Sequence, residues 1–167
     1  MAKINSAFIA ICILMSLVTS TDVVAEEKSI TIRDEATYED ERSIPYKIRK
    51  ECTQLGRQFS DSTERFLSKA GWAVNRSDSR SGEGLELNLV ITNAYSAGNA
   101  WIGHRKSVTI EAQLFKNGEM VDHFEAVRDS SGGFAGGFKG SCDVLHRCVN
   151  TLGKDVTEWL ADISGHL

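Results

Sequence analysis

The sequence has little proline and no surplus of positive charge. It holds one proline among 167 residues, and its formal net charge is −4. A chain with so little proline and no low-complexity tract is unlike a disordered or linker-joined protein. The missing basic stripe argues against nucleic acid as a partner. These absences leave an ordinary folded and mildly acidic protein as the expectation.

The motifs that usually carry catalysis are missing as well. No Gly-x-Ser-x-Gly elbow and no His-Glu-x-x-His pair occurs in the chain. The glycine-rich run 129–140 lacks the Gly-Lys-Ser/Thr sequence of a phosphate loop. Cys142 and His146 are the minimum pair for a thiol nucleophile, and Cys148 would give a third metal ligand without an evident fourth. We therefore predict no enzyme, no metal site and no cofactor.

Residues 1–25 have the pattern of a secretory signal peptide. A basic start precedes the apolar run Ala7–Val18, which is too short to span a bilayer, and 23–25 ends in a small residue suited to cleavage. Cys12 follows Ile11 instead of the small residue that a lipid-attachment site requires. We predict a soluble, exported protein that resides in the periplasm.

The remaining residues, 26–167, are enough for one domain with its own core. Alternating apolar residues predict strands at 29–33, 72–76, 85–96, 106–115 and 119–128, with a loop at 97–105. Apolar residues three and four positions apart predict a long helix over 43–70 and a second of about 22 residues from Ser141.

Both predicted helices are apolar on one side only, so both can lie on the same face of one sheet. The fold class that follows is α+β: a two-layer sandwich of two long helices on a mostly antiparallel sheet of about five strands. The predicted order is β-α-β-β-β-β-α, with a crossover between the first two strands and an antiparallel meander after it.

The last two strands should form a hairpin around Asn117-Gly118. A three-residue loop with Gly118 in a bulge pairs Leu114 with Met120 and Ile110 with Phe124. This register keeps apolar residues on one face, whereas a strict two-residue loop would place charges there. We predict the bulged three-residue loop.

Three cysteines follow the predicted signal peptide: Cys52, Cys142 and Cys148. An odd number leaves one thiol unpaired. We expect a Cys142–Cys148 disulfide, with Cys142 placed before the helix, and Cys52 as a buried free thiol. A bridge from Cys52 to one of the other two is the alternative.

A resemblance lies in three segments: Gly98-Asn99, the strand Val108–Gly118 with its Asn-Gly end, and Ser131–Gly137, followed by a terminal helix. This pattern, over roughly Leu85–Leu160, resembles small uncharacterised bacterial envelope proteins that are similar to accessory domains of cell-envelope transport and secretion systems. Many such proteins are lipoproteins, whereas this chain has no lipobox. The resemblance implies a non-enzymatic periplasmic accessory role and carries over no site residues.

Two functions remain. The first is an interaction protein with an envelope partner, contacted through a sheet edge, the uncovered sheet face with Val121 and Val127, or two loops. The loop candidates are Trp101, Ile102, Phe134 and Phe138. The second is a small-ligand binder with a pocket between the helices and the sheet, near Trp72, Trp101 and the glycine-rich loop. The oligomeric state is left open.

Overall fold

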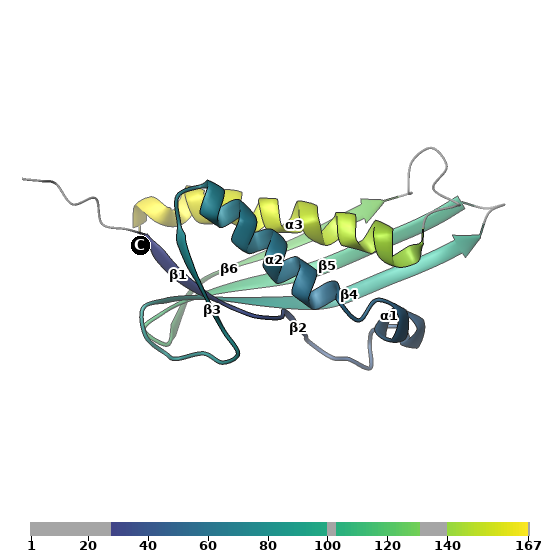
Figure 1. The fold of residues 1–167 in the computed structure, drawn as a ribbon, viewed down its shortest axis with the longest axis horizontal. Coiled ribbons are helices and arrows are strands. Elements are labelled where there is room, and N and C mark those ends of the chain that lie inside the picture. Colours follow the sequence, from purple (N-terminus) through teal and green to yellow (C-terminus); the bar gives the residue numbers. More distant parts are fainter. Residues whose placement is uncertain (1–27, 100–102, 131–139, 167) are drawn as a thin grey trace, which may run out of the picture.

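The computed structural model describes residues 28–99, 103–130 and 140–166. Its strands are β1 (Ser29–Arg33), β2 (Thr37–Tyr38), β3 (Ala73–Ser77), β4 (Leu85–Asn99), β5 (Gly103–Lys116) and β6 (Glu119–Ser130). Its helices are α1 (Tyr46–Glu51), α2 (Leu55–Lys69) and α3 (Ser141–Ile163), with the 3-10 turn η2 (Ser164–His166) after α3 (Figure 1). The predicted signal peptide lies outside the described residues.

The strands form one mixed sheet in the order β3-β1-β4-β5-β6, with β2 beside β4. β1 pairs in parallel with β3 on one side and with β4 on the other. A parallel pair needs a long connection, and α1 and α2 supply it between β1 and β3, as predicted. The predicted antiparallel meander holds only for β4, β5 and β6, because β1 lies between β3 and β4.

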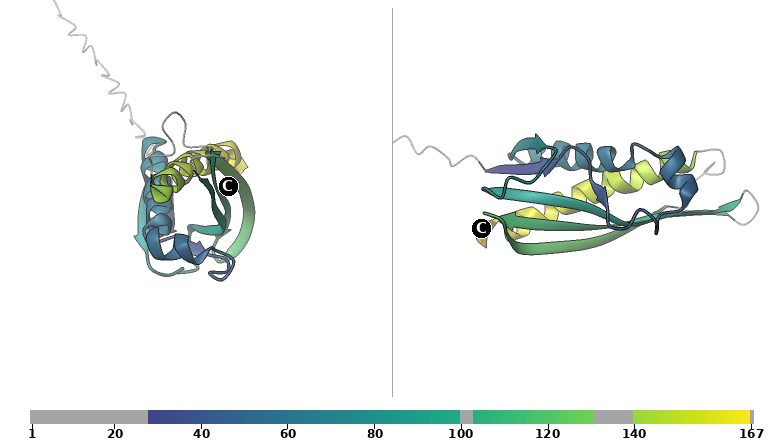
Figure 2. Two further views of the ribbon diagram at one scale, coloured as in Figure 1. Left: turned by 90° about the vertical axis from the view of Figure 1, so that its right-hand side faces the viewer. Right: turned by 90° about the horizontal axis from the view of Figure 1, so that it is seen from below.

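Both long helices lie along one side of the sheet (Figures 1 and 2), which confirms the predicted two-layer α+β architecture. The core between the layers contains alternate residues of the strands, such as Leu87, Leu89, Ile110 and Leu114, packed against the apolar stripes of α2 and α3. The apolar residues that alternate along the strands and those that form a stripe along each helix therefore face one another in a single core.

The helix predicted over 43–70 is two helices. α1 ends at Cys52, whose backbone N–H donates to the carbonyl of Ile48, and α2 begins three residues later. Gly56, in the first turn of α2, lies so close to the backbone carbonyl oxygen of Ala36 that an added Cβ would overlap with it. The break is set by contacts with distant segments, which a helical pattern does not show.

The disulfide prediction was wrong. Cys52 is bridged to Cys142, with their Cα atoms 5.3 Å apart, and Cys148 is the buried free thiol. α2 and α3 begin at the same end of the molecule (Figure 1), so a bridge between their starts is short in space although it joins residues 90 apart. Cys148 lies inside α3, with its side chain in the core.

The β5–β6 hairpin has a different register from the predicted one. Lys116 pairs with Glu119 across a two-residue turn, in which Asn117 and Gly118 both have positive φ (52° and 84°). This is the backbone that a type I′ turn requires. A bulge follows between Leu114 and Phe115, after which Ile110 pairs with Ala126. The bulge returns apolar residues to the core face.

Candidate functional site

The four loop residues proposed as interaction candidates, Trp101, Ile102, Phe134 and Phe138, lie outside the described residues, as does most of the glycine-rich run. The sequence candidates that can be placed are the cysteines and His146.

The environments of Cys142, Cys148 and His146 differ from one another. Cys142 is in a disulfide and cannot act as a thiolate. Burial raises the pKa of the Cys148 thiol, so little thiolate forms there. Burial likewise lowers the pKa of His146, whose Nε2 atom is buried with no hydrogen-bond partner in the described part of the chain. Among the described residues no group of three or more His, Cys, Asp or Glu side chains could hold a metal ion.

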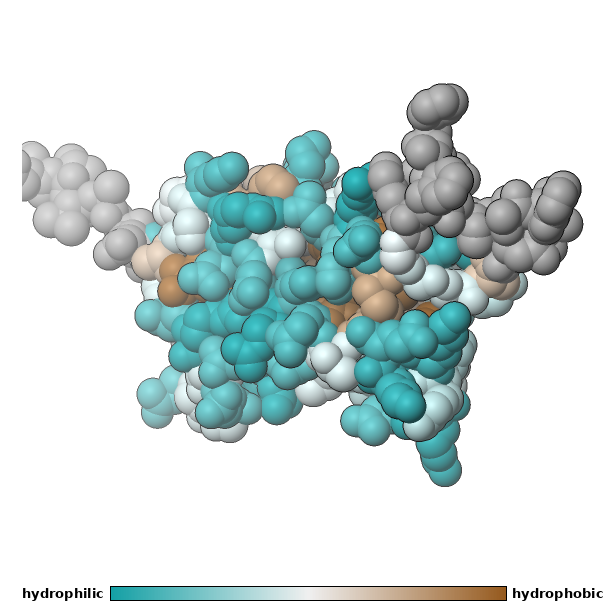
Figure 3. Space-filling view, turned by 45° about the vertical axis from the view of Figure 1, so that its right-hand side comes forward, coloured by the Kyte–Doolittle hydropathy of each residue, from teal (hydrophilic) through white to brown (hydrophobic). Residues whose placement is uncertain are grey.

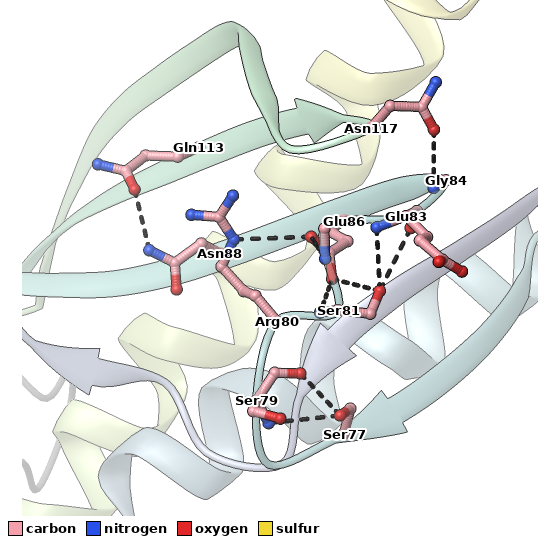
Figure 4. A network of polar contacts seen from close by, with 11 residues as sticks. Ser77, Ser79, Arg80, Ser81, Glu83, Gly84, Glu86, Asn88, Gln113 and Asn117 are labelled. Carbon is pink, nitrogen blue, oxygen red and sulfur yellow. Dashed lines mark hydrogen bonds and ion pairs between the residues drawn. The ribbon is translucent and has the colours of Figure 1, made fainter.

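The sheet face away from the helices is only partly open. The segment between β3 and β4 folds over one end of it, and Glu86, 2% exposed, accepts hydrogen bonds from Ser81 and Gly82 (Figure 4). Burial alone would raise the pKa of Glu86, but these bonds outweigh it and the pKa lies below its ordinary value. Arg80 lies above the Phe115 ring at 3.5 Å from its centroid. The segment between β3 and β4 therefore covers this end of the sheet face and is held there by its polar contacts with Glu86.

Strand β6 leaves the other side of the sheet open. It is the last strand in the sheet order, so one row of its backbone groups has no strand beside it among the described residues. Five large hydrophobic side chains are exposed in the described residues, and three of them, Met120, Val121 and Val127, belong to β6. Exposed apolar side chains concentrated on an edge strand are typical of a surface that contacts another molecule.

A groove of about 430 Å³ lies between β6 and α3. The aromatic rings of Phe124 and Trp159 stack in it, with centroids 5.6 Å apart and planes 14° from parallel. Beside them Arg128 donates two hydrogen bonds, of 2.7 and 2.6 Å, to the carboxylate of Asp155. The lining residues are Phe124, Ala126, Val127, Arg128, Asp155, Glu158, Trp159 and Asp162.

In the groove, the charges of Arg128 and Asp155 neutralise each other. The hydrogen bonds and the charge of Asp155 raise the pKa of Arg128, so the ion pair persists at any physiological pH. Glu158 is exposed and pairs with Lys154 one turn away at 2.8 Å, and Asp162 is exposed at the end of the groove. The groove therefore offers an aromatic floor with acidic groups at its rim.

We call the groove together with the exposed Met120, Val121 and Val127 the β6–α3 surface. The sequence predicted Val121 and Val127 on the uncovered sheet face, but it did not predict the groove. Trp159 lies within the helix predicted from Ser141, and the structure shows it only partly buried. The Arg128–Asp155 pair joins residues 27 apart, and only the packing of α3 beside β6 brings them together.

Figure 3 shows one face of the molecule, which is largely hydrophilic and exposes apolar atoms in small, separate patches. No helix within the described ranges 28–99, 103–130 and 140–166 is both long and apolar enough to cross a bilayer.

Comparisons with known proteins identify the fold but no family. No family model matches the sequence, and no curated protein matches it. Protein XCC0632 from Xanthomonas campestris, described as DUF330, has a TM-score of 0.54 at 12% identity, covering 84% of this chain and 87% of its own. The PelC dodecamer from Paraburkholderia phytofirmans has 0.51 at 13%, covering 78% and 89%.

A third similar structure is the hypothetical protein CT253 from Chlamydia trachomatis, with a TM-score of 0.50 at 9% identity, covering 80% of this chain and 98% of its own. All three come from bacteria. At these identities the similarity shows a shared fold and nothing about activity. The chain is thus an α+β sandwich whose open feature, within the described residues, is the β6–α3 surface.

Proposed function

We propose that this protein is a non-enzymatic interaction protein of the bacterial cell envelope, which docks a protein partner through the β6–α3 surface. The observation that carries the proposal is the coincidence on one edge strand of three exposed apolar side chains and a 430 Å³ groove. Edge strands bind partners by adding a strand, and adjoining grooves accept side chains.

Two features support a location outside the cytoplasm. The first 25 residues have the pattern of a signal peptide. The Cys52–Cys142 disulfide joins two helices in the core, and such bridges persist in oxidising compartments such as the periplasm. The envelope is therefore the place in which a partner is to be sought.

The fold is also compatible with self-assembly. One similar structure, PelC, is a dodecamer. Its low sequence identity transfers no interface to this chain, but it shows that a protein of similar fold can assemble into a dodecamer. A second copy is therefore among the partners to be tested.

Site-directed photo-crosslinking in intact cells tests the proposal. The photoreactive amino acid p-benzoylphenylalanine replaces Val127 on β6, which is 53% exposed, and in a control protein replaces the exposed Lys69 on α2. We expect a discrete adduct from position 127 that is absent from position 69, and a weaker adduct when Val121→Asp is added. Equal adducts from both positions, or none from 127, would contradict a docking surface at β6.

The second candidate function is the binding of a small ligand, which the volume of the groove favours because small-molecule sites commonly measure about 300–1,000 Å³. It would occupy the groove beside Trp159, not the predicted pocket near Trp72, since Trp72 is only 7% exposed. A saturable change of tryptophan fluorescence on titration with sugars, lipids or metabolites, lost in Trp159→Phe, would favour this function over protein docking.

A further inference from the structure

The second prominent feature of the surface is helix α1. Tyr46 is 69% exposed, more than any other large hydrophobic side chain exposed in the described ranges. The charged groups of Arg49 and Lys50 each lie 6.0 Å from the centre of its ring, and Lys47 is exposed next to it. We call Tyr46, Lys47, Arg49 and Lys50 the α1 knob. An aromatic side chain flanked by cations is a common anchor at protein interfaces.

The charge of the α1 knob is opposite to that of the β6–α3 surface. α1 carries three cations and one carboxylate. The groove of the β6–α3 surface is lined by one cation, Arg128, which is already bonded to Asp155, and by two further carboxylates, Glu158 and Asp162. Glu158 pairs with Lys154, so Asp162 adds the unbalanced negative charge. The β6–α3 surface therefore favours a positively charged occupant.

The α1 knob is rigidly mounted. Ile48 anchors α1 in the core, and Cys52 at its C-terminal end is bridged to the start of α3. Little conformational entropy is therefore lost when the knob is bound by another molecule.

The knob and the surface lie on different sides of the molecule. α1 follows β2, and both β1 and β2 pair with the side of β4 that faces away from β5. β6 lies beyond β5, at the opposite edge of the sheet. Figures 1 and 2 show α1 and β6 well separated. A contact between knob and surface must therefore join two molecules head to tail.

We infer that the occupant of the β6–α3 surface is the α1 knob of a second copy of this chain. Tyr46 would lie against the aromatic pair Phe124 and Trp159, and the lysines of the knob would face Glu158 and Asp162. This inference rests on the proposed docking function and names its partner. A head-to-tail contact leaves one knob and one surface free at the ends, so it builds rings or filaments and not closed pairs.

Charge complementarity within the chain favours this occupant over an unrelated one. Each copy has a net charge of −4, so copies repel unless a cationic region of one meets an acidic region of the next. The knob and the surface provide such a match, with an aromatic contact in the middle, and every copy carries both.

Two charge-reversal variants test the inference. In the first, Lys47→Glu and Lys50→Glu reverse the knob; in the second, Glu158→Lys and Asp162→Lys reverse the surface. All four positions are exposed, and cations near the end of α3 suit the helix dipole, so both variants should fold. Circular dichroism and the intact disulfide check this. The molar mass of each protein is measured by sedimentation velocity over a range of concentrations.

We expect the wild-type protein to self-associate, and each variant alone to associate at least about tenfold more weakly, which corresponds to about 1.4 kcal/mol. The mixture is the sharper readout. The normal knob of the second variant can bind the normal surface of the first, and the reversed knob of the first meets a surface of opposite charge on the second. The mixture should therefore regain the association that each variant alone has lost. Raising the salt from about 0.1 M to about 1 M should weaken both contacts.

The outcomes separate this inference from the proposed function. A wild-type protein that stays monomeric while Val127 crosslinks to a different protein overturns the second copy and leaves the docking function intact. Self-association that neither reversal weakens, or a mixture that associates no more strongly than either variant alone, also overturns it. The absence of both self-association and any adduct at Val127 removes the proposed function itself.

Discussion

Helix α3 has two flanks of different character. The flank toward α2 is closed: a Cβ added to Gly153 would lie 2.8 Å from the backbone nitrogen of Thr63 and 2.9 Å from the carbonyl carbon of Ser62. The flank toward β6 is open, and a groove with aromatic, acidic and basic side chains lies along it. One helix thus combines a seam of small residues on one side with large, partly hydrated residues on the other.

The difference shows which side of the helix serves stability and which is available for binding. Where two helices approach within backbone contact, water is excluded and every added atom must displace another. Where a strand and a helix are separated by a groove, the side chains between them keep part of their hydration and can exchange it for a partner. Substitutions should therefore have large effects on the closed flank and small effects on the open one.

The disulfide at the start of the closed flank should give the largest effect. Replacing both Cys52 and Cys142 by serine releases a loop of 90 residues, and the chain-entropy estimate for a loop of that size is about 4.6 kcal/mol. Urea denaturation should show this loss, and a reductant should reproduce it in the wild type. In Cys148→Ala, the control, the reductant should have its full effect. A wild-type transition unchanged by reductant would contradict the bridge.

Gly153→Ala should give the next largest effect, with a sign opposite to the usual one. Alanine normally stabilises a helix by about 0.5–1 kcal/mol relative to glycine. Here the new methyl group meets the backbone of α2, and overpacking of this kind costs about 1–3 kcal/mol. We expect a net destabilisation by thermal or urea unfolding. The control is Gly165→Ala in η2, where nothing lies within 4 Å of the added Cβ. Equal stability of Gly153→Ala and Gly165→Ala would contradict the close packing of α3 against α2 at Gly153.

The spacing of apolar residues predicted most of the strands and helices of this fold, because that spacing reflects which side chains are buried. Phe124 was assigned to the core side of the hairpin and is packed against the core, whereas Met120, assigned to the same side, is 57% exposed. The predicted partner of Phe124 was wrong because a two-residue turn at Asn117-Gly118 followed by a bulge at Val121 gives residues beyond the bulge the same facing as the predicted loop, with a different register. The alternation of apolar and polar residues along a strand shows which side chains face the core. It does not determine which residue of the neighbouring strand each one pairs with.

Features that depend on topology were out of reach. The disulfide was predicted to be local because Cys142 and Cys148 are close in sequence, whereas the common starting end of α2 and α3 brings Cys52 to Cys142. The placement of β1 between β3 and β4 has no local signal either. The groove requires both β6 at the sheet edge and α3 beside it, so its residues could be predicted one by one as strand or helix but not as a site.

Arg128→Ala on the open flank should have the smallest effect on stability. The Arg128 side chain is 48% exposed and that of Asp155 only 10%. In a closed interior, removal of the arginine would leave an unpaired carboxylate at a cost of about 3–5 kcal/mol. Beside an open groove, water can replace the guanidinium group, so we expect a loss of about 1 kcal/mol or less, nearer to that of an exposed pair.

A double-mutant cycle with Asp155→Ala measures the Arg128–Asp155 pair directly, because each variant removes one partner and the double variant removes both. A coupling free energy well below the effect of Gly153→Ala supports the contrast between the two flanks. A loss of several kcal/mol from Arg128→Ala would mean that water does not reach Asp155. The β6 flank would then be as closed as the α2 flank, and the case for docking at this edge of the sheet would rest on the exposed side chains of β6 without the groove.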